Sequence, residues 1–313
     1  MEQVERRLDD VAVLTPADRV VTIGSFDGIH RGHHLLLVRT VERARELDMA
    51  SLAVTFEPIP AMVLRPDRFP GRICPAGEKQ ERLVDAGFNH VLTLAFDLPF
   101  SRQSPESFME WLAAETGLKE LWVGEAFALG RDRAGNVERL RAIGEMLGFS
   151  VASLPRLMDD GNVISSSAIR TAIQAGNASL ARRLLGRPFR VAGEVIHGAH
   201  LGRTIGYPTA NVEPPSELVR LPDGIYVSCA QVAGESAPRQ SMTYVGTRPT
   251  VNSGMRMVET HILDFDGDLY GQTLAVDVLE RIRGDELFDS LEALIAQLKR
   301  DETSTRAYFA AST

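Results

Sequence analysis

The sequence of 313 residues contains very little lysine. Lys79, Lys119 and Lys299 are the only lysines among its 34 basic residues, and the others are arginines. None of the three lies in a glycine-rich segment, which excludes the phosphate-binding loop in which a lysine directly follows the last glycine. We therefore expect a phosphate site in this chain to use backbone N–H groups, arginine, histidine or a metal ion.

Cysteine and long apolar segments are also scarce. Cys74 and Cys229 are far apart and form no CxxC pair, so the sequence predicts neither a zinc site nor a disulfide framework. No stretch approaches the ~20 apolar residues of a membrane helix, and residues 1–10 lack the apolar run of a signal peptide. We expect a soluble, cytoplasmic protein without a membrane partner.

Positive charge is in deficit as well. Lysine and arginine total 34 against 42 acidic residues, which gives a net charge of −8. A nucleic-acid-binding surface needs a positive field, so we expect no nucleic-acid partner. A single nucleotide needs only a local positive pocket and stays possible. The oligomeric state is left open.

The first part of the chain alternates between strand-like apolar runs and helical patterns. A chain of this length exceeds what one hydrophobic core usually serves, so about two domains are expected. The alternation predicts a Rossmann-like α/β domain with a doubly wound parallel sheet. Its strands are expected at Val20–Gly24, Ser51–Phe56, His90–Phe96, Leu121–Gly124 and Phe149–Leu154, and its helices at Gly32–Leu47, Glu78–Ala86, Pro105–Glu115 and Val137–Leu147.

The second part has a different pattern. Short strands are separated by Gly, Pro and Asp turns, and no long helix is expected before Leu287–Arg300. This pattern predicts a small antiparallel β-barrel followed by a C-terminal helix. We place the domains at residues 1–186 and 187–313. The strands are expected at Phe189–His197, Gly224–Val232, Gln240–Gly246, Met257–Phe265 and Leu274–Ile282.

A glycine-rich turn connects the first predicted strand to the first predicted helix. It reads Gly24-Ser25-Phe26-Asp27-Gly28. Ligands of open α/β sheets bind beyond the carboxyl ends of the strands, so a nucleotide is expected at this turn. His30 and His33 lie on the first helical turn and can face one site, where they could stabilise charge on a transferred phosphoryl group. The alternative is a helix start with two surface histidines.

These residues resemble a known family. Residues 24–33 look like the HxGH loop of nucleotidylyltransferases, and the wider context looks like the N-terminal module of prokaryotic bifunctional riboflavin kinase/FAD synthetases. Thr55–Pro58, Glu78-Lys79 and Phe96-Asp97 recur at the family's spacing. The resemblance implies a nucleotidylyltransferase-like domain that binds ATP at the glycine turn and converts FMN to FAD, with His30 and His33 as catalytic residues.

A later segment, Ile164–Arg170, is similar to a second motif of the family. Ser165, Ser166 and Arg170 could form a phosphate clamp at the start of a helix. Ordinary helix capping would explain the serines but not the arginine.

The family pattern is broken at three positions. Ala126 stands where the family has Asp or Asn, Leu129 where it has an aromatic residue, and Ile59 where histidine is common. Losing a hydrogen bond to a charged ligand costs about 1.5–3 kcal/mol. An active kinase with an impaired or regulatory N-terminal domain therefore remains an alternative.

The second half contains its own candidate site. The segment Gly193–Gly206 is punctuated by glycines, so it can fold over phosphates, and Gly198, Gly202 and Arg203 are candidate ATP-binding residues. Thr209 and Asn211 alternate along the extended segment that follows, so both side chains can point to one face. Hydroxyl and amide oxygens suit Mg²⁺, which together with ATP phosphates makes these two residues candidate metal ligands.

Residues 193–211 resemble the riboflavin kinase module, and Val245–Thr250, Glu259–Phe265, Leu269–Gly271 and Arg281–Arg283 continue the likeness in order. The resemblance implies that Glu259 is the general base for the riboflavin hydroxyl. Arg281 and Arg283 are candidate flavin-binding residues. An ion pair between Glu259 and Arg256 is the structural alternative, and His197, His200 and His261 receive no role.

The favoured function is therefore FAD biosynthesis. Riboflavin and ATP would give FMN in the second domain, and FMN with a further ATP would give FAD and pyrophosphate in the first. A tRNA-charging enzyme shares the HxGH-type loop, but the chain has no KMSKS-like lysine segment. A non-catalytic flavin-binding module is a further alternative.

Overall fold

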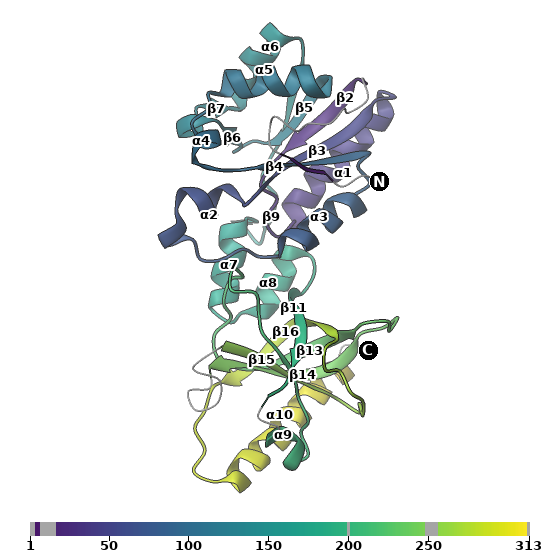
Figure 1. Cartoon of the computed structure of the whole chain (residues 1–313), viewed down its shortest axis with the longest axis vertical. Helices are drawn as coiled ribbons and strands as arrows, with labels where there is room; N and C mark the ends of the chain where they lie inside the picture. The colour runs from purple at the N-terminus through teal and green to yellow at the C-terminus, as the bar shows by residue number, and fades with distance from the viewer. Residues whose placement is uncertain (1–3, 7–16, 199–200, 248–255, 312–313) are drawn as a thin grey trace. The chain divides into compact units, whose positions relative to one another are not determined.

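The computed structural model describes residues 4–6, 17–198, 201–247 and 256–311 of the chain, and Figure 1 shows its elements. The chain forms two compact units. The first comprises residues 1–70 and 74–166, and the second comprises residues 71–73 and 167–313. The predicted division at residue 186 stays a prediction. Among the described residues, no helix is long and apolar enough to cross a membrane.

A parallel sheet forms the centre of the first unit, as predicted. Its six strands follow the order β1-β4-β3-β2-β5-β8, and every neighbouring pair is parallel. The strands are β1 (Val4–Arg6), β2 (Arg19–Ile23), β3 (Ala50–Glu57), β4 (His90–Ala95), β5 (Leu118–Gly124) and β8 (Ser150–Leu154).

Helices cover both faces of this sheet. Leu52 and Val54 of β3 pack in one cluster with residues of α5 and α6, whereas Ala53 between them packs in another with residues of α1 and α3. This alternation is the signature of a doubly wound sheet, so the predicted architecture is confirmed. The helices are α1 (Arg31–Glu46), α2 (Pro60–Leu64), α3 (Ala76–Asp85), α4 (Leu98–Ser101), α5 (Pro105–Thr116) and α6 (Val137–Leu147), with short 3₁₀ turns η2 (Pro66–Arg68) and η3 (Arg131–Arg133).

Two small hairpins complete this unit, and the sequence patterns did not indicate either. One pairs β6 (Ala128–Leu129) with β7 (Gly135–Asn136), and the other pairs β9 (Met158–Asp159) with β10 (Asn162–Val163). Strands of two residues are too short to show a periodic pattern. The predicted helix boundaries hold better, because Ser104 caps α5 and Gly148 ends α6 in the left-handed conformation.

The second unit contains a closed antiparallel barrel, also as predicted. Its strands follow the order β11-β12-β15-β14-β13-β16, and β16 pairs with β11 to close it. They are β11 (Phe189–Ile196), β12 (Ala210–Val212), β13 (Gly224–Val232), β14 (Arg239–Thr247), β15 (Arg256–Ile262) and β16 (Thr273–Gly284), and the helices are α7 (Ser166–Gln174), α8 (Ala178–Leu185), α9 (Leu201–Thr204) and α10 (Leu291–Ala311).

The C-terminal helix differs from the prediction at both ends. It begins after Ser290, whose hydroxyl accepts a hydrogen bond from the backbone N–H of Ala293. Leu287, the predicted start, is fully exposed in the preceding loop. The helix also continues beyond Arg300 to Ala311, because Asp301 and Thr305 lie on its buried face.

A three-residue segment from the first half of the chain belongs to the second unit. Gly71–Ile73 runs parallel to residues 217–219, and the backbone N–H of Arg72 donates to the carbonyl of Glu217 (2.8 Å). The N–H of Val219 donates in turn to the carbonyl of Arg72 (2.8 Å). Arg72 is buried there and forms an ion pair with Glu217.

Candidate functional sites

The glycine turn leaves the carboxyl end of β2 and leads directly into α1. The backbone N–H of Gly24 donates to the carbonyl of Val54 (3.0 Å), which ties the turn to the neighbouring strand. Gly28 has a φ of 81°, a conformation that favours glycine. Phe26 also has a positive φ, and its ring is buried in the core cluster that includes Leu37 and Leu83. The turn is therefore held in one conformation at the edge where nucleotides bind.

His30 and His33 stack on one another at the start of α1. Their ring centroids are 3.6 Å apart and nearly parallel. His30 caps the helix, because its Nδ1 accepts a hydrogen bond from the backbone N–H of His33 (3.2 Å). In a neutral His30 the proton is therefore on Nε2, which can act as a donor.

His33 is held neutral by its surroundings. Burial first, and the neighbouring His30 second, keep the pKa of His33 well below its ordinary value. Its ring meets Phe26 edge-on at 5.4 Å, and its buried Nδ1 has no hydrogen-bond partner among the described residues. The pair thus offers imidazole hydrogen-bonding groups rather than two full positive charges.

The predicted serine clamp lies next to the same turn. The hydroxyl of Ser166, the first residue of α7, donates to the carbonyl of Asp27 (3.0 Å), and Ser165 precedes it half-buried. Arg170 belongs by its contacts to the second unit, where its Nε donates to the carbonyl of Gly71 (2.8 Å). The structure therefore brings Ser166 to the glycine turn, and the role of Arg170 there stays a prediction.

The segment that departs from the family pattern follows β5. Ala126 is exposed, and its carbonyl accepts a hydrogen bond from Arg133. Leu129 in β6 packs against the core cluster beside α5 and α6, so an apolar side chain fills the position where the family has an aromatic one. Ile59 is buried at the start of α2.

A buried lysine stands near the same edge of the sheet. Lys79 of α3 is 1% exposed, and its ammonium group contacts the Glu57 carboxylate (2.8 Å) and the Phe56 carbonyl (2.7 Å). The family resemblance singled out Glu78-Lys79 and Thr55–Pro58, and the structure shows that these two motifs meet. Their contact fixes the end of β3.

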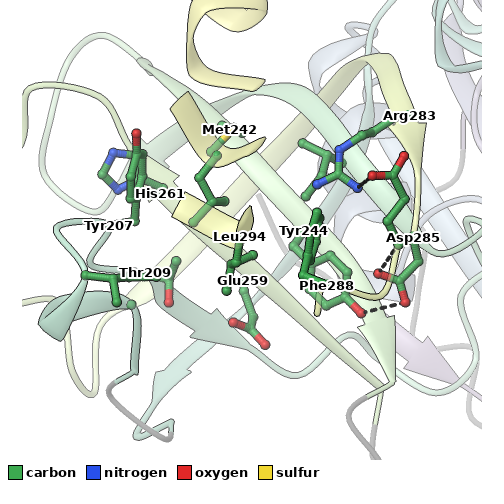
Figure 2. Close-up of a pocket in the computed structure, with 15 residues that line it drawn as sticks. Tyr207, Thr209, Met242, Tyr244, Glu259, His261, Arg283, Asp285, Phe288 and Leu294 are labelled. Carbon is green, nitrogen blue, oxygen red and sulfur yellow. Dashed lines mark hydrogen bonds and ion pairs between the residues drawn. The ribbon is translucent and has the colours of Figure 1, made fainter. Parts of the chain in front are cut away.

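In the second unit, a cavity of about 220 Å³ lies between the barrel and α10, and Figure 2 shows it. One end is marked by Tyr207, Thr209 and His261, and the other by Arg283 and Phe288. Its lining consists of Gly202, Ile205, Tyr207, Thr209, Ile225, Met242, Tyr244, Glu259, His261, Arg283, Asp285, Glu286, Phe288, Leu294 and Leu298.

Glu259 and Thr209 both line this cavity, as their motifs led us to expect. Glu259 is 6% exposed on β15, directly opposite Asn211 of β12 in the strand register. The alternative ion pair with Arg256 does not form, because Arg256 pairs with Asp223 (2.6 Å) and donates to the carbonyl of Leu221. A carboxylate in such an apolar, half-closed cavity suits proton abstraction.

Asn211 is buried beside these two residues. Its Nδ2 donates to the carbonyl of Thr209 (3.4 Å), which turns the amide oxygen the other way. A side chain at Gly198 would meet Asn211 Nδ2 at 2.5 Å, so any larger residue there would have to displace the Asn211 amide. The glycine loop also touches the Thr209 segment at Gly202, whose carbonyl accepts a hydrogen bond from the N–H of Tyr207 (2.8 Å).

Of the three predicted arginines Arg203, Arg281 and Arg283, only Arg283 lines the cavity. Arg203 is exposed on α9. Arg283 lines the cavity and is held by the buried Asp301 carboxylate of α10 (2.8 Å). Arg281 is not brought to the cavity, because its Nη2 donates to the carbonyl of Asp223 (2.8 Å). His200 and residues 248–250 of the Val245–Thr250 motif lie outside the described residues.

Several cavity residues had no signal in the sequence. Met242, Tyr244 and Phe288 read as ordinary apolar residues of strands and loops until the barrel brings them together. The motifs assign no role to His261, although it stands two residues after Glu259 and therefore on the same face of β15. This period of two was the one signal that could have identified it.

Comparison with known proteins identifies the family to which the chain belongs. The FAD synthetase family model matches residues 14–168, and the riboflavin kinase family model matches residues 185–309. The bifunctional riboflavin kinase/FMN adenylyltransferase of Pseudomonas fluorescens is 39% identical over 295 residues, which cover 94% of each chain. The chain belongs to this bifunctional family.

Two further likenesses extend along more than nine-tenths of the chain. The Escherichia coli K12 member of the family is 38% identical and is matched over 93% of this chain and 92% of its own. A crystal structure described as a macrolide-efflux protein from Streptococcus pneumoniae has a TM-score of 0.87 and 32% identity, with 97% of this chain and 98% of that chain covered.

Membership of the family decides between the two functional readings. Both family models are matched, and the curated relatives are named for both activities. The reading with riboflavin kinase and FMN adenylyltransferase activity is therefore supported, and the reading with a kinase alone is not. ATP is the co-substrate that both activities imply.

Proposed function

We propose that the cavity in the second unit is the riboflavin kinase site and that Glu259 is its general base. The observation that carries the proposal is the position of Glu259 and Thr209 in one cavity with mainly apolar walls. The Glu259 carboxylate takes the proton from the terminal hydroxyl of riboflavin. The hydroxyl oxygen then attacks the γ-phosphorus of ATP, and ADP leaves.

The donor set beside Glu259 fits Mg²⁺. Thr209 and Asn211 offer a hydroxyl and an amide oxygen, which are the hard ligands that Mg²⁺ accepts, together with nucleotide phosphates. Among the described residues, no group of three His, Cys, Asp or Glu side chains could hold a metal by itself. Two oxygen ligands that share the ion with ATP are consistent with this arrangement. A bound Mg²⁺ would neutralise charge on the transferred phosphoryl group.

Phosphates and flavin occupy opposite sides of Glu259 in this proposal. Gly198 lies beside Asn211, and Gly202 of α9 lies beside Thr209. These two glycines and Arg203 of α9 bind the ATP phosphates through backbone N–H groups and a guanidinium. The flavin ring lies against the apolar walls toward Arg283 and Phe288. Arg281 stays a predicted flavin ligand without support from the cavity geometry.

We also propose that the glycine turn and His30–His33 form the adenylyltransferase site. The phosphate of FMN attacks the α-phosphorus of ATP, and pyrophosphate leaves. The His30 and His33 imidazoles donate hydrogen bonds to the oxygens where negative charge grows. Backbone N–H groups of residues 24–28, with Ser165 and Ser166, position the triphosphate. Arg170 stays a predicted participant. ATP is an intracellular metabolite, so we place both reactions in the cytoplasm.

A paired assay on one preparation tests the two assignments together. Riboflavin conversion to FMN and FMN conversion to FAD are measured separately, with MgATP and inorganic pyrophosphatase. We expect Glu259→Gln to lower FMN formation by about 10²–10⁴-fold, the usual contribution of a general base, and to leave FAD formation from FMN unchanged. Normal FMN formation by this variant would refute the base assignment.

A binding measurement distinguishes catalysis from simple flavin binding. Glu259→Gln should bind riboflavin with nearly wild-type affinity, since the substitution keeps the size and polarity of the side chain. Loss of FMN formation with intact binding excludes a non-catalytic flavin-binding module. Chelation of Mg²⁺ should stop both reactions while riboflavin still binds.

A further inference from the structure

The Thr209 segment is attached to β15 by more than backbone pairing. The ladder between β12 and β15 starts at Ala210, which is paired with Thr260. Thr209 and Pro208 precede this start, and proline has no N–H with which to extend a ladder. The candidate metal ligand therefore stands just beyond the regular sheet.

His261 forms a hydrogen bond with the segment that precedes the ladder. Its Nδ1 lies 2.8 Å from the carbonyl oxygen of Pro208. A carbonyl can only accept a hydrogen bond, so Nδ1 carries the proton and the neutral imidazole has its lone pair on Nε2. The side chain thus donates a hydrogen bond to this carbonyl where the backbone ladder no longer continues.

Tyr207 connects His261 to helix α10. The Tyr207 ring meets the His261 ring edge-on at 5.1 Å, and the Tyr207 hydroxyl donates to Glu302 (3.1 Å). Burial, with this hydrogen bond as a smaller cause, raises the pKa of Tyr207 to about 12, so the hydroxyl keeps its proton. Figure 2 shows Tyr207 and His261 together at the end of the cavity where Thr209 stands.

We propose that His261 is a positioning residue of the kinase reaction. Its imidazole holds the Pro208 carbonyl, and this places the Thr209 hydroxyl where it can bind the metal ion of the nucleotide. The inference rests on the proposed role of Thr209 as a metal ligand. His261 has no part in proton transfer under this proposal, and Glu259 keeps that task.

Two substitutions separate the hydrogen bond from the ring. His261→Phe keeps an aromatic ring against Tyr207 and removes the donor. His261→Asn removes the ring, but its amide N–H can stand where the imidazole Nδ1–H stood. If His261→Phe fails to fold, His261→Gln replaces it, because its longer side chain carries the amide away from Pro208.

The readout is the binding of ADP by calorimetry in the presence of Mg²⁺ and in the presence of a chelator. We expect His261→Phe to weaken Mg²⁺-dependent binding by about tenfold, the upper range for one hydrogen bond, and to leave metal-free binding unchanged. His261→Asn should retain affinity within about twofold of wild type. FAD formation from FMN should be the same in all variants and serves as the control for an intact first unit.

A double-mutant cycle with Thr209→Ala tests whether His261 acts through Thr209. If it does, adding His261→Phe to Thr209→Ala causes no further loss of Mg²⁺-dependent affinity. The proposal is overturned if the two losses multiply, if His261→Phe binds Mg²⁺ADP like wild type, or if His261→Asn is as weak as His261→Phe. If Thr209→Ala leaves the Mg²⁺ dependence of ADP binding unchanged, the metal-ligand role of Thr209 is overturned as well. If Thr209→Ala weakens Mg²⁺-dependent binding and His261→Phe does not, only the role of His261 is overturned.

Discussion

The second unit should depend for part of its stability on an ion pair between β16 and the C-terminal helix. Arg283 donates from Nε (3.0 and 3.1 Å) and from Nη2 (2.8 Å) to the carboxylate of Asp301. The two side chains are 14% and 2% exposed. Removing the arginine would leave a buried carboxylate with the Gln297 amide (2.8 Å) as its remaining side-chain donor.

The expected cost follows from this burial. Breaking a buried ion pair by removing one partner costs about 3–5 kcal/mol, and the retained Gln297 bond favours the lower end, so we expect Arg283→Met to lose about 3 kcal/mol. For a unit of this size that corresponds to a fall of about 6–12 °C in melting temperature. The double variant Arg283→Met with Asp301→Asn removes the buried charge and should recover at least half of the loss.

Intrinsic spectroscopy can assign the loss to the correct unit. Trp111 and Trp122, the two tryptophans, belong to the first unit, and all five tyrosines belong to the second. Tryptophan fluorescence during urea unfolding therefore reports on the first unit, and tyrosine derivative absorbance reports on the second. The reasoning is refuted if Arg283→Met shifts the tyrosine transition by less than about 1 kcal/mol, or if the double variant is no more stable than the single one.

Three further predictions concern the two sites. His30→Asn keeps a capping acceptor for α1 but loses the imidazole N–H, so FAD formation should fall by about 10²–10³-fold with FMN formation intact; equal activity would contradict the histidine assignment. Because burial lowers the pKa of His33 in the folded state, the unfolded chain binds a proton first as pH falls. The first unit should therefore lose about 1 kcal/mol between about pH 7.5 and 5.5, by tryptophan fluorescence, relative to a His33→Asn control; an identical pH dependence in both proteins would contradict this. Gly198→Ala would place a methyl group 2.5 Å from Asn211 Nδ2, so the KM for MgATP in the kinase assay should rise while the FAD-forming step stays unchanged; an unaltered KM would show that Asn211 does not contribute.

Most of the fold could be predicted from the sequence, because its main signals are local. The strands near Val20 and Ser51 are continuous apolar runs, and Ser104 and Gly148 mark helix ends by their own backbone chemistry. The extent of α10 could not be predicted in this way. Its buried face carries the polar residue Asp301, which reads as a surface residue until Arg283 is placed beside it.

The candidate sites followed a similar division. Glu259, Thr209, His30 and His33 lie in short motifs that resemble those of the family, and this resemblance predicts their roles. The apolar wall formed by Met242 and Leu298 arises only when β14 and α10 meet, and no local pattern records such a meeting. Arg281 shows that a motif can also include a residue whose contacts differ from those of its neighbour. Arg281 and Arg283 belong to one short motif, but their side chains contact different partners.

The segment Gly71–Ile73 makes the second unit discontinuous in sequence, which limits how the chain can be dissected. A fragment that starts anywhere after Ile73 lacks the backbone partners of Glu217 and Val219. Their carbonyl and N–H groups would then have to bind water or another chain, because unpaired backbone groups favour association with other chains. Expressing the barrel alone therefore removes part of the second unit together with the first unit. A fragment to which residues 71–73 are attached is the better design for studying the second unit in isolation.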